Sequence, residues 1–164
     1  MEHACRTRLS RTVTVAVVVL LAALLSGCEA AESTNEVTVA GIDYAFDAPD
    51  TISPGPTAIA FENRGKVLHE MILVRLKEGV TLEQVMQGVQ GGDDPSEFTE
   101  GGPGILIAKP GEMAETRLLV DLLPGRTYAL VCNLQDEPEA PPHTALGMRS
   151  SFVVSGTADS SSGG

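Results

Sequence analysis

The segment Val131–Phe152, "VCNLQDEPEAPPHTALGMRSSF", places a cysteine, a histidine and a methionine between two apolar runs. Ten residues separate Cys132 from His143, and four separate His143 from Met148. A thiolate, an imidazole and a thioether are all metal ligands, and the prolines and glycine between them are typical of a loop. Whether this loop binds a metal depends first on whether Cys132 is free.

The N-terminal residues predict export. Three arginines within the first eleven residues precede the apolar run Val13–Leu25. At thirteen residues, this run fits a signal peptide and is shorter than the roughly 20 residues that span a bilayer as a helix. The following "LSGC", Leu25–Cys28, resembles the lipobox of bacterial lipoproteins. That resemblance implies acylation of Cys28 and anchoring at the extracytoplasmic face of the cell membrane. The alternative is an ordinary signal peptide with an incidental cysteine.

Cleavage before Cys28 changes the cysteine and charge counts. Cys5 is lost and Cys28 is acylated, which leaves Cys132 as the one free thiol and excludes an internal disulfide. Without the signal segment, 8 basic and 21 acidic residues remain, a net charge of −13. So acidic a chain is unsuited to nucleic acid, and a charge-steered partner protein should be basic. We expect a signal peptide at 1–27, a flexible tether at 28–36, one domain at 37–155 and a loose tail at 156–164.

The expected domain reads as short strands broken by Gly and Pro. Strict apolar–polar alternation predicts strands at 36–46, 57–65 and 112–122, and a nearly continuous apolar run predicts a central strand at 66–76. Further strands are predicted at 126–132, where Tyr128, Leu130 and Cys132 share one face, and at 148–154. Ile52 is the single apolar residue of a turn region. About seven short strands predict an all-β, antiparallel Greek-key β-sandwich.

One short helix interrupts the strands. In "TLEQVMQGVQ", Thr81–Gln90, Thr81 is placed as N-cap and Gln84 completes a capping box. The segment 91–104, "GGDDPSEFTEGGPG", is expected to be loop. Its acidic side chains are calcium ligand types, but their spacing matches no EF-hand, which favours a solvated loop.

Cys132, His143 and Met148 together with His69 make the ligand set of a copper electron-transfer centre. Sulfur and imidazole ligands hold both Cu(I) and Cu(II). The chain resembles the cupredoxin, or blue copper, family in "FENRGKVLHE" (61–70), "LLPGRTYALVC" (122–132) and "PPHTALGM" (141–148). The family pattern of Tyr, three residues, Cys, then His, then Gly-Met is met by Tyr128, Cys132, His143, Gly147 and Met148.

That resemblance implies one copper ion held by His69, Cys132 and His143, with Met148 as axial ligand. It also implies that His143 is partly exposed as the route for electrons. Two features differ from the family. The ten-residue spacer is longer than in small soluble members, and Glu70 stands where Asn or Ser often donates to the thiolate. We expect the acidic spacer 133–142 to be the docking surface for a basic redox partner.

The implied function is a membrane-tethered electron carrier, neither an enzyme nor a binder of a small-molecule substrate. Two alternatives remain open: copper delivery or storage without electron transfer, and a metal-free interaction domain in which Cys132, the histidines and Met148 only pack. "HEMIL" lacks the second histidine of a zincin, and no oxyanion or substrate cleft is evident for a Cys–His hydrolase.

Overall fold

A computed structural model describes residues 34–156 of the chain. The expected signal peptide, Cys28, most of the tether and nearly all of the tail lie outside this range. Contacts group Ser33–Gly164 as one compact unit, which contains every strand and the whole described core. No helix among the described residues is both long and apolar enough to cross a membrane.

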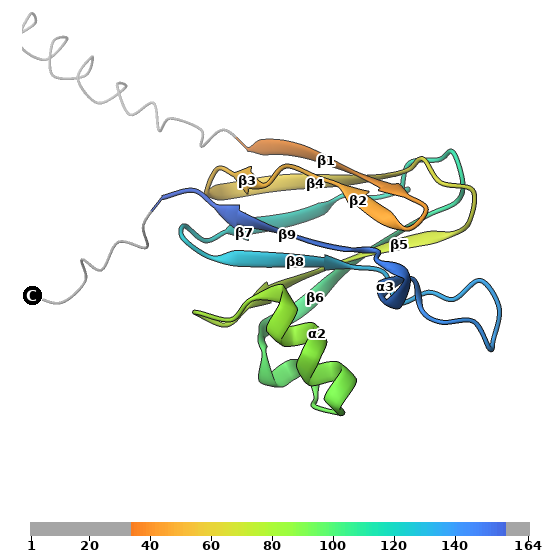
Figure 1. Ribbon diagram of the computed structural model, residues 1–164. Coiled ribbons are helices and arrows are strands. Elements are labelled where there is room, and N and C mark those ends of the chain that lie inside the picture. Colours follow the sequence, from red (N-terminus) through yellow and green to blue (C-terminus); the bar gives the residue numbers. More distant parts are fainter. Residues whose placement is uncertain (1–33, 157–164) are drawn as a thin grey trace, which may run out of the picture. The chain divides into compact units, whose positions relative to one another are not determined.

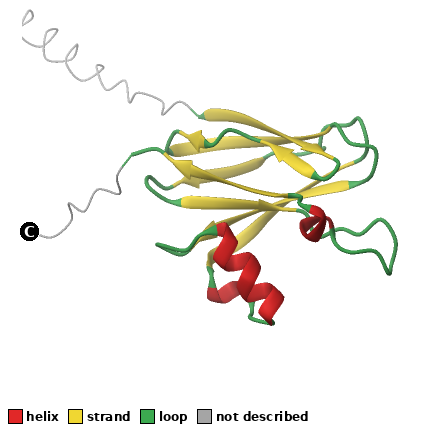
Figure 2. Ribbon diagram, viewed as in Figure 1, coloured by secondary structure: helices red, strands yellow, loops and turns green. Residues whose placement is uncertain are grey.

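Nine strands and three short helical segments make up this unit (Figures 1 and 2). The strands are β1 (Asn35–Ile42), β2 (Ala45–Asp47), β3 (Thr51–Ile52), β4 (Gly55–Asn63), β5 (His69–Leu76), β6 (Thr99–Ala108), β7 (Leu118–Leu122), β8 (Thr127–Val131) and β9 (Arg149–Val154). The helical segments are α2 (Leu82–Gly91), the 3₁₀ turn η1 (Pro95–Glu97) and α3 (His143–Leu146).

The strands form two sheets, which confirms the predicted all-β sandwich. One sheet has the order β2-β1-β4-β7, and the other has the order β3-β9-β8-β5-β6. The pairing is mixed rather than wholly antiparallel, because β1 runs parallel to β4 and β3 runs parallel to β9. Period-two alternation indicates which face of a strand is buried but not the direction of its neighbour, so the sequence did not reveal these pairs.

The core lies between the sheets and consists of alternate side chains from facing strands. Its largest fully buried members include Phe61, Met71, Leu130 and Phe152. Burying apolar side chains of this size is the main source of stability in such a domain. Tyr128 stacks on Phe152 with ring centroids 5.4 Å apart, and its hydroxyl accepts the Leu123 N–H at 3.2 Å.

Several strand predictions differ from the structure. Of the expected strand 112–122 only Leu118–Leu122 forms β7, and Thr51–Ile52 of the expected turn region forms the short strand β3. The expected strand 36–46 is divided into β1 and β2 by a turn at Asp43 and Tyr44. Strand β6 was missed, because "GGPG" at 101–104 is typical of a loop. β6 is an edge strand, where glycine and proline are tolerated because one side of the strand has no neighbour to bond.

Helix α2 is confirmed with its predicted capping box. The Gln84 N–H donates to Thr81 Oγ1 at 3.2 Å, and the Thr81 N–H donates to Gln84 Oε1 at 2.8 Å. The helix buries Val85 against Leu76 and Ala129, which belong to β5 and β8. Figure 1 shows α2 outside the sheet that contains these strands.

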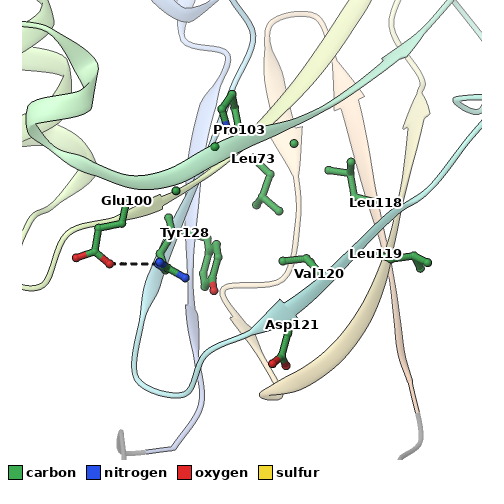
Figure 3. A pocket seen from close by; sticks show the side chains of 12 residues that line it. Leu73, Glu100, Pro103, Leu118, Leu119, Val120, Asp121 and Tyr128 are labelled. Carbon is green, nitrogen blue, oxygen red and sulfur yellow. Dashed lines mark hydrogen bonds and ion pairs between the residues drawn. The ribbon is translucent and has the colours of Figure 1, made fainter.

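A cavity of about 260 Å³ opens where the edge strands β6 and β7 approach each other. Figure 3 shows Leu73, Leu118 and Tyr128 around it, with Glu100 at one side. The Glu100 carboxylate is paired with Arg75 at 3.3 Å and with Arg126 at 2.8 Å. Its charge is therefore already compensated within the sheet.

Asn63 joins the end of β4 to the strand that begins with His69. It is fully buried, and its side-chain N–H groups donate to the carbonyls of Val67 and Ala108, each at 2.8 Å. Its Oδ1 accepts the Gly65 N–H at 2.8 Å. Because Ala108 pairs with His69 across β6 and β5, Asn63 holds the loop before His69 in place.

Candidate metal centre

Three of the four predicted ligands meet at one buried point. Their candidate ligand atoms, on His69, Cys132 and His143, all lie within 4.8 Å of one another. The two Nδ1 atoms are 3.2 Å apart, and Cys132 Sγ is 3.4 Å from His143 Nδ1. The three residues are at most 1% exposed. Among residues 34–156, this is the one group of three or more His, Cys, Asp or Glu side chains close enough to share a metal ion.

Neighbouring strands place His69 and Cys132 side by side. β5 and β8 are antiparallel with Ile72 opposite Val131, so Cys132, the residue after β8, comes opposite Met71 and two positions from His69. Side chains alternate along β5, and His69 is on the same inward face as Met71 and Leu73. The predicted common face of Tyr128, Leu130 and Cys132 is the buried one, since all three side chains are at most 3% exposed.

The long spacer folds back so that His143 returns to Cys132. The Thr144 N–H donates to the Cys132 carbonyl at 2.7 Å, and the His143 N–H donates to the Leu134 carbonyl at 2.8 Å. His143 then begins α3, a single turn that the sequence did not predict. Figure 1 shows α3 at the end of β8 and β9, with the spacer extending beyond it. The ten residues between the two side chains therefore form a closed loop.

Met148 lies next to this group and is fully buried. Its N–H donates to the His143 carbonyl at 2.9 Å, and its carbonyl accepts the Cys132 N–H at 3.2 Å. Gly147 ends α3 at φ +115°, a conformation that favours glycine. The methionine thus enters β9 directly beside both of its predicted co-ligands, but its role as an axial ligand stays a prediction.

Two carboxylates that the sequence analysis missed bind the outer nitrogens of the histidines. His69 Nε2 is 2.8 Å from Asp43 Oδ1, and His143 Nε2 is 3.1 Å from Asp136 Oδ1. Gly65 lies against the first pair, and a Cβ there would collide with Asp43 and lie 2.8 Å from His69 Nε2. Asp136 belongs to the acidic spacer between Cys132 and His143, so its place in the sequence could have indicated a position near His143. Asp43 lies in the turn after β1, far from His69 in the sequence, and nothing in the sequence indicated their contact.

These carboxylates determine what the inner nitrogens can do. A carboxylate accepts, so each Nε2 is best assigned as the protonated nitrogen and each Nδ1 as a bare lone pair. Two lone pairs and the Cys132 sulfur then face one another at short range, with at most the thiol proton between them. Three converging acceptors in a buried site are unfavourable without a cation. The donor set therefore fits a metal ion.

Burial and hydrogen bonding shift the pKa of the Cys132 thiol in opposite directions. Burial raises the pKa of the thiol above its usual value, although N–H groups of Glu70 and Leu134 act to lower it. The Glu70 N–H donates to Sγ with nitrogen and sulfur 3.5 Å apart, so the backbone rather than an Asn or Ser side chain supplies the donor at this position. The Glu70 carboxylate instead accepts the Asn133 N–H at 2.9 Å, and its negative charge acts to raise the pKa of the Cys132 thiol.

The expectation that His143 is partly exposed is wrong, because only 1% of this residue is exposed. Tyr44 covers it, with ring centroids 4.8 Å apart, and Asp136 caps its outer nitrogen. The Tyr44 hydroxyl donates to Asp136, which lowers the pKa of that carboxyl and raises the pKa of the phenol. The pKa of Asp43 is also lowered: burial acts to raise it, but bonds from His69 and from backbone N–H groups outweigh burial.

The acidic segment at 93–97 shows no sign of a calcium site. All of its residues are exposed, and Asp94 caps η1 by accepting the Ser96 N–H at 2.8 Å, which lowers the pKa of its carboxyl. The preference for a solvated loop is consistent with this exposure.

Comparisons with known proteins give no family assignment from sequence. No protein-family model matches the chain, and no curated protein matches it.

Solved structures with related folds include copper proteins. Reduced auracyanin from the photosynthetic bacterium Roseiflexus castenholzii is 18% identical with a TM-score of 0.45, over 77% of this chain and 99% of that chain. Auracyanin B is 21% identical with a TM-score of 0.46, over 78% and 92%. Auracyanin A, a "blue" copper protein from Chloroflexus aurantiacus, is 20% identical with a TM-score of 0.41, over 74% and 99%. At such low identities and TM-scores, these likenesses do not establish a family for this chain.

Proposed function

We propose that this protein binds one copper ion through His69, Cys132 and His143, with Met148 as a weaker axial ligand, and carries single electrons. The observation that supports this most directly is the convergence of two Nδ1 atoms and one sulfur in a buried site. Imidazole and thiolate bonds to a metal of this size are about 2.0–2.3 Å long. Donor atoms 3.2–3.4 Å apart are therefore close enough to share one ion.

Bound copper would supply a reversible one-electron couple between Cu(I) and Cu(II). The protein residues supply rigidity. Asp43 and Asp136 hold each imidazole with its Nδ1 inward, and such outer partners orient metal-bound histidines. The backbone bond from Thr144 to Cys132 closes the ligand loop. A rigid, dry site changes little when one electron is added, which favours electron transfer.

Copper delivery is the second candidate, and burial disfavours it. A delivery protein must release its ion to a partner, but none of the three donors is more than 1% exposed. Release would require opening the contacts of Tyr44 and Asp136 over His143. The dispersed placement of Met71, Met86 and Met113 gives no second copper-binding cluster.

We also propose that the chain is anchored through acylated Cys28 at the extracytoplasmic face of the cell membrane. Support comes from the basic segment, the apolar run and the "LSGC" motif of the sequence. The partner proposed for this carrier is a basic redox protein. Support for that comes from Asp136, Glu137 and Glu139, which are exposed on the spacer next to His143.

Copper loading tests the ligand set. Ser33–Gly164 with Cu(II) should bind one equivalent and show an intense thiolate-to-copper charge-transfer band in the visible spectrum, because Cys132 binds directly. Cys132→Ser should lose the band. Met148→Leu should keep the band, because the axial ligand is weak, but should change the energy of the band and the reduction potential of the copper. A colourless protein that retains no copper would contradict the proposal, and irreversible voltammetry would favour storage.

The carboxylates give a second test. Asp136→Ala should weaken copper binding by about 10–100-fold, because His143 loses the partner that orients it. Glu137→Ala removes the same charge from the same loop, touches neither histidine, and should change affinity by less than about twofold. Asp43→Ala and Asp47→Ala form the matching pair at His69. Competition with a chelator measures each affinity, and equal losses within a pair would refute the positioning role.

The anchor is tested by Cys28→Ser in the full chain. The unchanged protein should partition into the detergent phase of a cell extract, and mass spectrometry should find acyl chains on Cys28. The variant should not be acylated. Unmodified Cys28 in the membrane-bound protein would exclude this anchor.

Salt dependence tests the partner's charge. Electron transfer to a basic haem carrier should slow steeply between about 10 mM and 200 mM salt, because screening weakens the attraction. Replacing Glu137 and Glu139 together with Gln should flatten this dependence and leave the visible spectrum unchanged. A rate that is independent of salt, or equally fast with an acidic carrier, would rule out a basic partner.

A further inference from the structure

A second cavity lies on the outer face of the β5–β8 sheet, and none of the proposed copper ligands lines it. Its volume is about 500 Å³, within the range of about 300–1,000 Å³ that is usual for small-molecule sites. Val85, Met86 and Val89 of α2 form one wall. The floor is the outer face of β5 and β8, with Ile72, Val74, Ala129 and Val131, and the remaining walls come from parts of 95–103 and from the ligand loop up to Arg149. We call this cavity the helix groove.

The helix groove persists because α2 is held at only part of its length. Val85 packs on Leu76 and Ala129, while Leu82, Met86 and Phe98 close the same cluster. Farther along the helix, Val89 is 40% exposed and faces the groove without a packing partner in either buried cluster. An apolar surface left open in a strongly charged protein is typical of a binding site.

The charge of the groove is opposite to that of the rest of the molecule. The whole chain carries 22 acidic and 11 basic residues, yet none of the side chains that line the groove is acidic. Its one charged member is Arg149, which forms no ion pair among residues 34–156. Arg149 donates to the Thr144 carbonyl at 2.8 Å, and a guanidinium has further N–H groups for another acceptor.

The apolar side chains of the lining are aliphatic. No Phe, Tyr or Trp lines the groove, so a flat ring would find no aromatic partner to stack on. A flexible methylene chain packs well against Val, Ile, Leu and Met side chains, and a carboxylate can pair with a guanidinium through two hydrogen bonds. From this aliphatic lining and from Arg149, the one charged residue of the groove, we infer that the helix groove binds one free fatty acid. The chain of the fatty acid would lie along α2 and its carboxylate at Arg149.

The test uses metal-free Ser33–Gly164, so its outcome does not depend on copper. Dodecanoate is the probe, and dodecyltrimethylammonium, with the same chain and opposite charge, is its control. Both are titrated below their micellar concentrations by calorimetry. We expect one dodecanoate per chain, bound at least about tenfold more tightly than the cation, because a charged hydrogen-bonded pair contributes about this much.

Three variants locate the site. Val89→Glu places an acidic group in the groove and should abolish dodecanoate binding. Val153→Glu makes the same change at a valine of similar exposure on β9, outside the groove, and should alter affinity by less than about twofold. In Arg149→Gln, the affinities for dodecanoate and for dodecyltrimethylammonium should differ by less than about twofold.

Amide chemical shifts of the unchanged protein decide the matter if a variant fails to fold. Dodecanoate should shift amides of α2 and of the outer face of β5 and β8. Shifts elsewhere, equal binding of both amphiphiles, absence of binding, or equal losses in Val89→Glu and Val153→Glu would overturn the inference. Groove amides that shift with protein concentration alone would overturn it too, because a second copy of the chain would then occupy the groove.

Discussion

The antiparallel pairing of β5 with β8 is the constraint on which the site depends. Its register pairs Ile72 with Val131, so that Cys132, the residue after β8, comes opposite Met71 and two positions from His69, on the same inward face. Both strands lie inside their sheet, and their inner faces contribute Met71, Leu73 and Leu130 to the core. Because a shift of one residue would turn a strand's inward side chains toward solvent, the packing of the core also determines the position of the donor atoms.

The site is more enclosed than the exposed-histidine arrangement expected from the sequence. Each imidazole has an inner nitrogen within 4.8 Å of the Cys132 sulfur and an outer nitrogen bound to a carboxylate. Tyr44 and the folded spacer cover His143, so an electron that reaches the site through this histidine must cross that layer. Such a cover excludes water and strengthens electrostatic interactions within the site, but it would also separate the proposed metal ligands from the proposed redox partner.

Local patterns accounted for much of the fold. The capping box of α2 was readable because its bonds join Thr81 to a residue three positions away. Strand alternation correctly placed Leu130 and Cys132 on one face, and the structure shows that this face is buried. Strand β6 was missed because its glycines and proline favour a loop locally, and only its position at a sheet edge allows a strand there. The turn at Asp43 was missed because the alternation continues through it.

By itself, the sequence determined the strand-rich class, the position of Cys132 as the one cysteine of the expected domain at 37–155, and the residue types of the candidate ligand set. These depend on composition and spacing, which a chain carries before it folds. Only the tertiary structure decided that Asp43 and Asp136 bind the two imidazoles, that His143 is buried, and that an aliphatic groove with one arginine lies beside α2. Each of these brings together residues from different elements, and such contacts depend on how whole sheets and loops pack rather than on local sequence.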